Sequence, residues 1–281
     1  MSKSQIIILI IAVCVILGSG GMLIKTAREY KMAENEYRNL ERYAEQTAPV
    51  EELPSLDTAS AVQGPIVQEE PEKELLKNTN RADFPDLEVD FAGLEEINRD
   101  VVAWLYVGGV GISYPVVQGE DNDYYLHQTF EDKKNSAGSI FMDWEVNADL
   151  TSWNTFIYGH NMKNGTMFGS LKRFIREEGL YEKDPYIYIF REEGIYRYKI
   201  YAYYMDSPDS KSYWTCDTLK EYRQYVRTVT DKSVYDCRTE ATEEDNSVTL
   251  VTCSGSGASK QRFFVHGIFL DWYAYQSANI K

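Results

Sequence analysis

The feature that most constrains the fold is a series of short β-type segments between residues 101 and 272, with one clear helix among them. Thr218 and Glu221 fit a capping box, and apolar residues recur at helical spacing as far as about Thr230. A shorter helix is expected over residues 87–98. Many short strands with few helices are typical of a closed or nearly closed β-barrel, so the sequence predicts a mainly β domain with a helix inserted before its penultimate strand. The predicted strands are residues 101–107, 112–117, 155–159, 186–190, 195–204, 247–252 and 262–272.

The N-terminal segment predicts a membrane anchor followed by a stalk. Residues 6–24 contain no charged side chain and are long enough to cross a bilayer. Residues 25–46 have the composition of a polar helix, and residues 47–80 contain prolines and many acidic side chains, as in a solvated spacer. A cleaved signal peptide is the alternative, since residues 18–20 are small, but the apolar run continues beyond them. The predicted organisation is a tail at 1–4, a transmembrane anchor at 5–24, a polar helical and acidic stalk at 25–80, and a folded domain at 81–281.

The charges restrict the partners but leave the topology open. The net charge of −15 repels phosphate groups, so nucleic acid is not an expected partner. Only Lys3 and the amino terminus precede the apolar run, whereas several basic residues follow it closely. By the positive-inside rule, this pattern taken alone favours a cytoplasmic domain. The basic residues after the run are Lys25, Arg28, Lys31 and Arg38.

Three cysteines outside the anchor are available for chemistry. Cys253 ends the predicted strand 247–252 and opens a loop of serine and glycine, so the strand would hold the thiol rigidly while the loop admits a substrate. Cys216 and Cys237 have no such setting, and we expect them to be free thiols. The cysteines and the three histidines form neither a disulfide framework nor a metal-binding spacing. From these residues alone, an inert buried thiol is the alternative at Cys253.

Two further residues are suited to assist a cysteine nucleophile. Arg262 follows Cys253 by nine residues, so a strand-loop-strand hairpin would bring its guanidinium beside the thiol, where it could bind an oxyanion. An exposed arginine paired with an acid is the alternative. His160 follows a glycine at the end of a predicted strand, which suits proton transfer at the rim of a domain. His127 and His266 are expected to be structural.

Three motifs resemble those of the sortase family, and they occur in the family's order. The resemblance covers about residues 85–275 and implies a sortase-like closed β-barrel as the catalytic domain. It also implies Cys253 as the nucleophile, His160 as the proton-transfer partner and Arg262 as the oxyanion-stabilising cation. The motifs are Tyr-Gly-His-Asn at residues 158–161, Thr-Leu-Val-Thr-Cys at residues 249–253 and Arg-Phe-Phe-Val-His-Gly at residues 262–267.

The chain also resembles class B sortases. The helix inserted at Thr218 is similar to an extra helix of that class, and residues 119–126 are similar to a segment that lines its substrate groove. Asp143 is a candidate to orient His160. The loop at 254–257 is richer in glycine than in many class B members, which bears on the recognised peptide and not on the chemistry. The resemblance implies three substrate-binding residues, Asn122, Leu126 and Tyr158.

The resemblance implies a membrane-anchored transpeptidase that needs no cofactor. Such an enzyme cleaves a C-terminal sorting signal after threonine, holds the surface protein as a thioester and transfers it to an amine of a cell-wall peptide or of a pilin lysine. It also implies a single-pass protein of the cell membrane with an extracytoplasmic catalytic domain, against the charge pattern. Two alternatives are an L,D-transpeptidase-like wall enzyme, whose Ser-His-Gly-x-Cys context is missing here, and a non-catalytic extracellular binding module, for which Cys253 would be dispensable.

Overall fold

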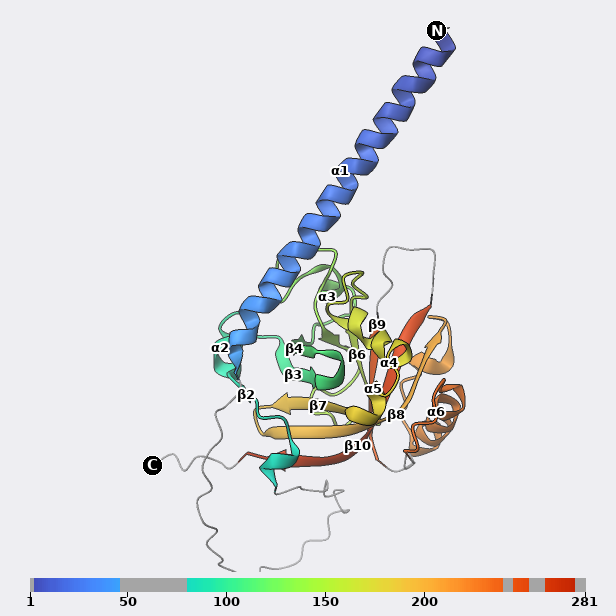
Figure 1. The fold of residues 1–281 in the computed structure, drawn as a ribbon. Coiled ribbons are helices and arrows are strands. Elements are labelled where there is room, and N and C mark those ends of the chain that lie inside the picture. Colours follow the sequence, from blue (N-terminus) through green and yellow to red (C-terminus); the bar gives the residue numbers. More distant parts are fainter. Residues whose placement is uncertain (1–2, 46–79, 240–244, 253–260, 276–281) are drawn as a thin grey trace, which may run out of the picture.

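A closed β-barrel forms the centre of the molecule (Figure 1). The computed structural model describes residues 3–45, 80–239, 245–252 and 261–275. The strand order around the barrel is β10-β8-β7-β3-β4-β5-β6-β9, and the β4–β5 and β6–β9 pairs are parallel. The barrel strands are β3 (Val101–Val107), β4 (Ile112–Val117), β5 (Phe141–Met142), β6 (Asn154–Gly159), β7 (Tyr186–Arg191), β8 (Gly194–Asp206), β9 (Ser247–Thr252) and β10 (Arg262–Ala274).

The helices lie around the barrel, and the long N-terminal helix runs up to its outside (Figure 1). A small two-stranded sheet, β1 (Ala44–Glu45) with β2 (Glu88–Val89), lies outside the barrel. The α-helices are α1 (Lys3–Leu40), α2 (Phe91–Glu95), α3 (Tyr124–His127), α4 (Arg173–Arg176), α5 (Leu180–Lys183) and α6 (Leu219–Lys232). The 3-10 helices are η1 (Glu41–Tyr43), η2 (Arg81–Asp83), η3 (Gly108–Val110), η4 (Phe168–Lys172) and η5 (Lys211–Tyr213).

The predicted mainly β barrel is confirmed, and the predicted bounds of β3, β4 and β9 are those of the structure. The two-residue strand β5 was not predicted, because so short a segment carries no periodic signal. The helix expected over residues 87–98 is also shorter, since Glu88 and Val89 pair with Ala44 and Glu45 instead. Tertiary pairing therefore overrides the local helical tendency at this point.

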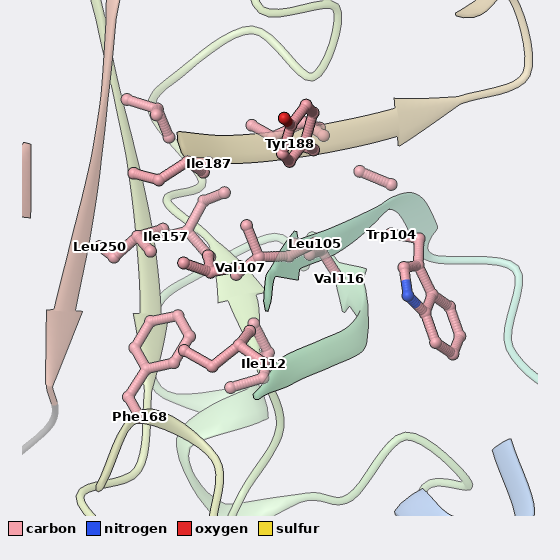
Figure 2. Close-up of a cluster of buried hydrophobic side chains, with 14 of the residues drawn as sticks. Trp104, Leu105, Val107, Ile112, Val116, Ile157, Phe168, Ile187, Tyr188 and Leu250 are labelled. Atoms are coloured by element: carbon pink, nitrogen blue, oxygen red, sulfur yellow. The ribbon is translucent and has the colours of Figure 1, made fainter. Parts of the chain in front are cut away.

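Two apolar clusters hold the barrel and its inserted helix together. Inside the barrel, Leu105, Ile157 and Leu250 from three different strands are fully buried and lie close together (Figure 2). A second cluster lies between the outer face of the barrel and α6. Thr218 and Glu221 form the predicted capping box, so α6 begins where the sequence indicates. The α6 side chains buried in the second cluster are Tyr222, Tyr225, Val226 and Val229.

Helix α1 continues without interruption from the predicted anchor into contact with the barrel (Figure 1). Among the described residues it is the one helix long and apolar enough to cross a membrane, judged by length and composition. Its C-terminal part is not a solvated stalk, because Ala33, Tyr37 and Leu40 are buried in the main core. The buried carboxylate of Glu36 accepts hydrogen bonds from the Thr129 hydroxyl and from the backbone at residue 131. The part of α1 from Ala33 to Leu40 therefore packs on the folded domain and does not belong to the solvated stalk expected at 25–80. The domain boundary at residue 81 remains a prediction.

We expect a truncated chain that begins at Arg81 to be less stable than one that begins at Lys25. The shorter chain lacks Tyr37 and Leu40, and burial of each large apolar side chain stabilises a fold by about 1.5–3 kcal/mol. The expected loss in the free energy of unfolding is therefore about 3–6 kcal/mol, measured by urea denaturation of the two chains side by side. Equal midpoints and slopes would show that α1 does not contribute to the folded domain.

Candidate active site

Three strand ends meet at one edge of the barrel and bring two of the predicted catalytic residues to the same place. Thr252, the last residue of β9, pairs in parallel register with Gly159, the last residue of β6. The backbone N–H of Phe263 donates a 2.8 Å hydrogen bond to the Thr252 hydroxyl. Gly159 and Phe263 thus both contact Thr252. His160 is the residue after Gly159 in the chain, and Arg262 is the residue before Phe263.

Cys253, the predicted nucleophile, lies outside the described residues, as does the loop at 254–257. It is the next residue in the chain after Thr252. Gly159 and Phe263, which contact Thr252, are themselves the chain neighbours of His160 and Arg262. The assignment of Cys253 rests on this framework and on the sequence motifs.

His160 is held in a closely packed setting. Its side chain is buried, and burial lowers the pKa of the imidazole. Its backbone carbonyl accepts hydrogen bonds from the N–H groups of Met162 and Phe168, which fix the loop after β6. A Cβ at Gly159 would lie 2.5 Å from Ile140 Cδ1 and 2.6 Å from the Phe168 ring, so only glycine fits before the histidine. This packing fixes where the imidazole is presented.

Arg262 has a buried hydrogen-bond donor for which the described residues offer no partner. Its side chain is half-buried, and the Nη1 atom makes no hydrogen bond within the described part of the chain. Asp206 is its cross-strand partner, but that carboxylate accepts from Lys232 Nζ at 2.5 Å and Ser212 Oγ at 2.8 Å. Burial alone would raise the pKa of Asp206, and these hydrogen bonds outweigh it and hold the pKa at about 2. The alternative of an arginine that forms a surface ion pair is not what the described residues show.

A buried carboxylate links two of the three predicted substrate-binding residues. Asp143 Oδ2 accepts from the Tyr158 hydroxyl at 2.7 Å and from Asn122 Nδ2 at 3.1 Å, and Asp143 Oδ1 accepts from the Glu145 N–H. Leu126 is half-buried on α3 and packs against the main core. The suggestion that Asp143 orients His160 gains no support, because its described hydrogen bonds go to other groups. Asp143 instead fixes Asn122 relative to Tyr158.

We expect Asp143→Asn to weaken substrate binding more than it slows turnover. Tyr158 and Asn122 both donate to Oδ2 of Asp143, while Oδ1 accepts from the Glu145 N–H. An asparagine has one acceptor oxygen and one NH2 group in their place, so it cannot accept from all three donors, and loss of a hydrogen bond to a charged group typically costs about 1.5–3 kcal/mol. If this loss falls on the bound state, KM rises by about tenfold to a hundredfold while kcat changes little. Steady-state kinetics on a cleavable peptide measures both. Tyr158→Phe, which removes one donor and keeps the ring, is the control, and an unchanged KM in Asp143→Asn would contradict the role in binding.

The other cysteines and histidines of the described chain have structural settings. Cys216 and Cys237 are buried free thiols, as predicted. Burial, together with nearby acids, raises the pKa of Cys216 to about 12 and that of Cys237 to about 11. His127 is exposed, whereas His266 is fully buried and burial lowers its pKa to about 3. Within the described ranges, no group of three or more His, Cys, Asp or Glu side chains is arranged to hold a metal ion.

One residue beside the site was missed from the sequence. The Tyr30 hydroxyl lies 3.5 Å from His160 Nε2, and the two rings meet edge to face with centroids 6.0 Å apart. A signal was present, because Tyr30, Ala33, Tyr37 and Leu40 recur at three-residue and four-residue spacing, as on one face of a helix. The high charge content of this segment favoured the interpretation as a solvated helix.

Comparison with known proteins identifies the family. The sortase domain model matches residues 105–268. Sortase B of Listeria monocytogenes is 34% identical over 166 residues, which are 57% of this chain and 65% of that protein. Sortase B of Staphylococcus aureus is 33% identical over 164 residues, which are 58% of this chain and 67% of that protein.

Solved structures agree with the sequence matches. The structure of Clostridium perfringens sortase B superposes with a TM-score of 0.60 at 32% identity and covers 65% of this chain and 100% of that chain. A Staphylococcus aureus sortase B–substrate complex gives a TM-score of 0.60 at 30% identity over 64% of this chain and 84% of that chain. The chain therefore belongs to the sortase family and is similar to its class B members.

Proposed function

We propose that this protein is a membrane-anchored cysteine transpeptidase that cleaves a C-terminal sorting signal after threonine and transfers the protein to an amine. The observation that supports this most directly is that β6, β9 and β10 meet at Thr252. Thr252 contacts Gly159 and Phe263, whose chain neighbours are His160 and Arg262. The buried Nη1 of Arg262 has no hydrogen-bond partner among the described residues, so it is a donor that could serve a developing oxyanion. Cys253 follows Thr252 directly.

The first half of the proposed reaction forms a thioester. The Cys253 thiolate attacks the threonine carbonyl carbon, and the electron pair of the C=O bond moves to oxygen, where Arg262 stabilises the charge. When the tetrahedral species collapses, the C–N bond breaks and His160 gives its proton to the leaving amine. The sorted protein is then bound to Cys253 through a C–S bond.

The second half releases the product to an acceptor. The acceptor amine attacks the thioester carbonyl, His160 takes its proton, and the Cys253 thiolate leaves. The new C–N bond replaces the one broken in the first half, so no oxidant, reductant or cofactor is consumed. The proposed acceptor is the amine of a cell-wall peptide or of a pilin lysine.

The proposed location is the cell membrane, with a single span in α1 and an extracytoplasmic catalytic domain. The apolar N-terminal part of α1 supports the span, and the family supports the side of the membrane against the basic residues after the apolar run. The proposed donors are surface proteins with a C-terminal sorting signal. A substrate complex is known for the Staphylococcus aureus relative, which supports recognition of a peptide by this fold. The family match disfavours the L,D-transpeptidase alternative.

Trapping the intermediate tests the proposal against a non-catalytic binding module. The full chain in detergent micelles is incubated with a panel of sorting peptides, quenched in acid and digested for mass spectrometry. We expect one peptide to leave its acyl portion on the fragment that contains Cys253, and hydroxylamine to remove it. Absence of an adduct with every peptide, or an adduct on Cys216 or Cys237, would refute the proposed function.

A further inference from the structure

The anchor helix reaches the predicted proton-transfer residue. Tyr30 lies six residues beyond the end of the predicted anchor, about 9 Å along the helix axis. Its hydroxyl is 3.5 Å from His160 Nε2, and its ring packs edge to face on the imidazole at an interplanar angle of 67°. Hydrogen bonds of catalytic groups are often long before substrate binds and shorten in the complex. The contact joins residues 130 positions apart in the chain.

Tyr30 is held in place by specific contacts on both sides along α1. The backbone carbonyl of Glu29 accepts from Asn135 Nδ2 at 2.9 Å, and the Glu29 carboxylate accepts from the Ser136 hydroxyl at 2.6 Å. Two turns further on, the Tyr37 hydroxyl accepts from the Ile140 N–H at 3.1 Å. Because these bonds join the helix to the segment between α3 and β5, the position of Tyr30 is determined by docking of α1 and not by its own side chain.

A tyrosine hydroxyl can serve both protonation states of the imidazole. It donates to Nε2 when the ring is neutral and accepts from Nε2–H when the ring is charged, since a hydroxyl has one donor and two acceptor positions. Tyrosine has a reference pKa of about 10 and so keeps its proton at neutral pH. While Tyr30 engages Nε2, the other ring nitrogen, Nδ1, is the one left to exchange a proton with a substrate amine.

We propose that Tyr30 is a positioning residue for His160, supplied by the same helix that forms the membrane anchor. The inference rests on the proposed function, because it assigns Tyr30 a role through the proton-transfer residue of that reaction. It makes α1 part of the active site, since docking of the helix carries the hydroxyl to the imidazole. Loss of the hydroxyl should alter the acid-base behaviour of His160, whereas loss of another α1 contact should alter stability alone.

The surroundings of His160 determine the sign of the effect. Burial lowers its pKa, and the structure gives no charged group among the described residues as a further cause. On α1, Glu29 and Glu34 near Tyr30 are half-buried, whereas Arg28 and Lys31 are exposed. Lys163 on the loop after β6 is exposed, and Arg262 at the start of β10 is half-buried. A hydrogen bond to a charged group is stronger than one to a neutral group, so Tyr30 favours the imidazolium. Removing the hydroxyl therefore lowers the pKa of His160 further and reduces its protonated fraction at neutral pH.

The experiment compares Tyr30→Phe with Tyr37→Phe in the full chain in detergent micelles. Both variants keep an aromatic ring on α1 and lose one hydroxyl that contacts the barrel domain, but only Tyr30 contacts His160. The imidazole is titrated by NMR, with the His160 signal assigned from its absence in His160→Asn, and the pH dependence of kcat is measured on a cleavable peptide. For Tyr30→Phe we expect the His160 pKa and the basic limb of kcat to move down by about half to one pH unit.

Further outcomes separate positioning from packing. In Tyr30→Phe we expect kcat at pH 8 to fall about threefold to tenfold with KM unchanged, in line with that pKa shift. In Tyr37→Phe we expect a lower melting temperature with the His160 titration unchanged. An unchanged titration in Tyr30→Phe, equal shifts in both variants, or a rise in kcat would overturn the proposal, the last because Tyr30 would then obstruct the site. The NMR titration needs no turnover, so it decides on Tyr30 even if the wild-type chain forms no thioester and the proposed function fails.

Discussion

Cys253→Ala is expected to reduce cleavage of sorting peptides to below about one thousandth of the wild-type rate, because the proposed reaction passes through a bond to its sulfur. Cys216→Ala and Cys237→Ala should keep most of the activity. Burial is the main cause that raises the pKa of these two thiols to about 12 and about 11, so thiolate is scarce in both at neutral pH. We therefore expect neither thiol to act as the nucleophile in place of Cys253.

The three alanine variants are compared by peptide cleavage and by thermal denaturation. Cys216 and Cys237 are buried, so their variants are expected to melt at lower temperature while still turning over. Cys253→Ala should fold and bind peptide, which separates loss of chemistry from loss of structure. Activity that survives in Cys253→Ala would overturn the assignment of the nucleophile.

Arg262→Lys is expected to impair turnover far more than peptide binding, although the positive charge is retained. The oxyanion exists only in and around the tetrahedral transition state, and a guanidinium offers it fixed donors where an ammonium is a mobile point charge. Loss of one such donor typically costs about 2.7–4 kcal/mol, which corresponds to a rate factor of about a hundred to a thousand. The buried Nη1 of Arg262 has no partner within the described chain that would compete for this role.

Binding and rate are measured separately to test this prediction. Steady-state kinetics compares wild type with Arg262→Lys, and peptide binding compares Cys253→Ala with the Cys253→Ala, Arg262→Lys double variant. Turnover within about threefold of wild type, or binding that falls as far as the rate, would make Arg262 a substrate anchor or a structural charge. In the wild type, Lys232 already pairs with Asp206, the cross-strand partner of Arg262. Arg262→Lys is therefore expected to leave this pair and the fold unchanged.

Local patterns were sufficient for most of the elements. The capping box at Thr218 and Glu221 determined where α6 begins, and runs of β-favouring residues bounded by turn or loop residues located β3, β4 and β9, because these signals depend on residues within a few positions of one another. The same patterns failed at β5, which is too short to show a period. They also failed at Glu88 and Val89, whose strand pairing depends on a partner far away in the chain.

The sequence by itself determined the β-rich architecture, the inserted helix and the three family motifs, since each is encoded by neighbouring residues. Tertiary structure decided which groups meet. Parallel pairing of β6 with β9 brings Gly159 to Thr252, Asp143 bonds to Asn122 and Tyr158, and docking of α1 brings Tyr30 to His160. These contacts depend on the register of a closed barrel and on burial of one helix face, and neither is specified by any short stretch of the chain.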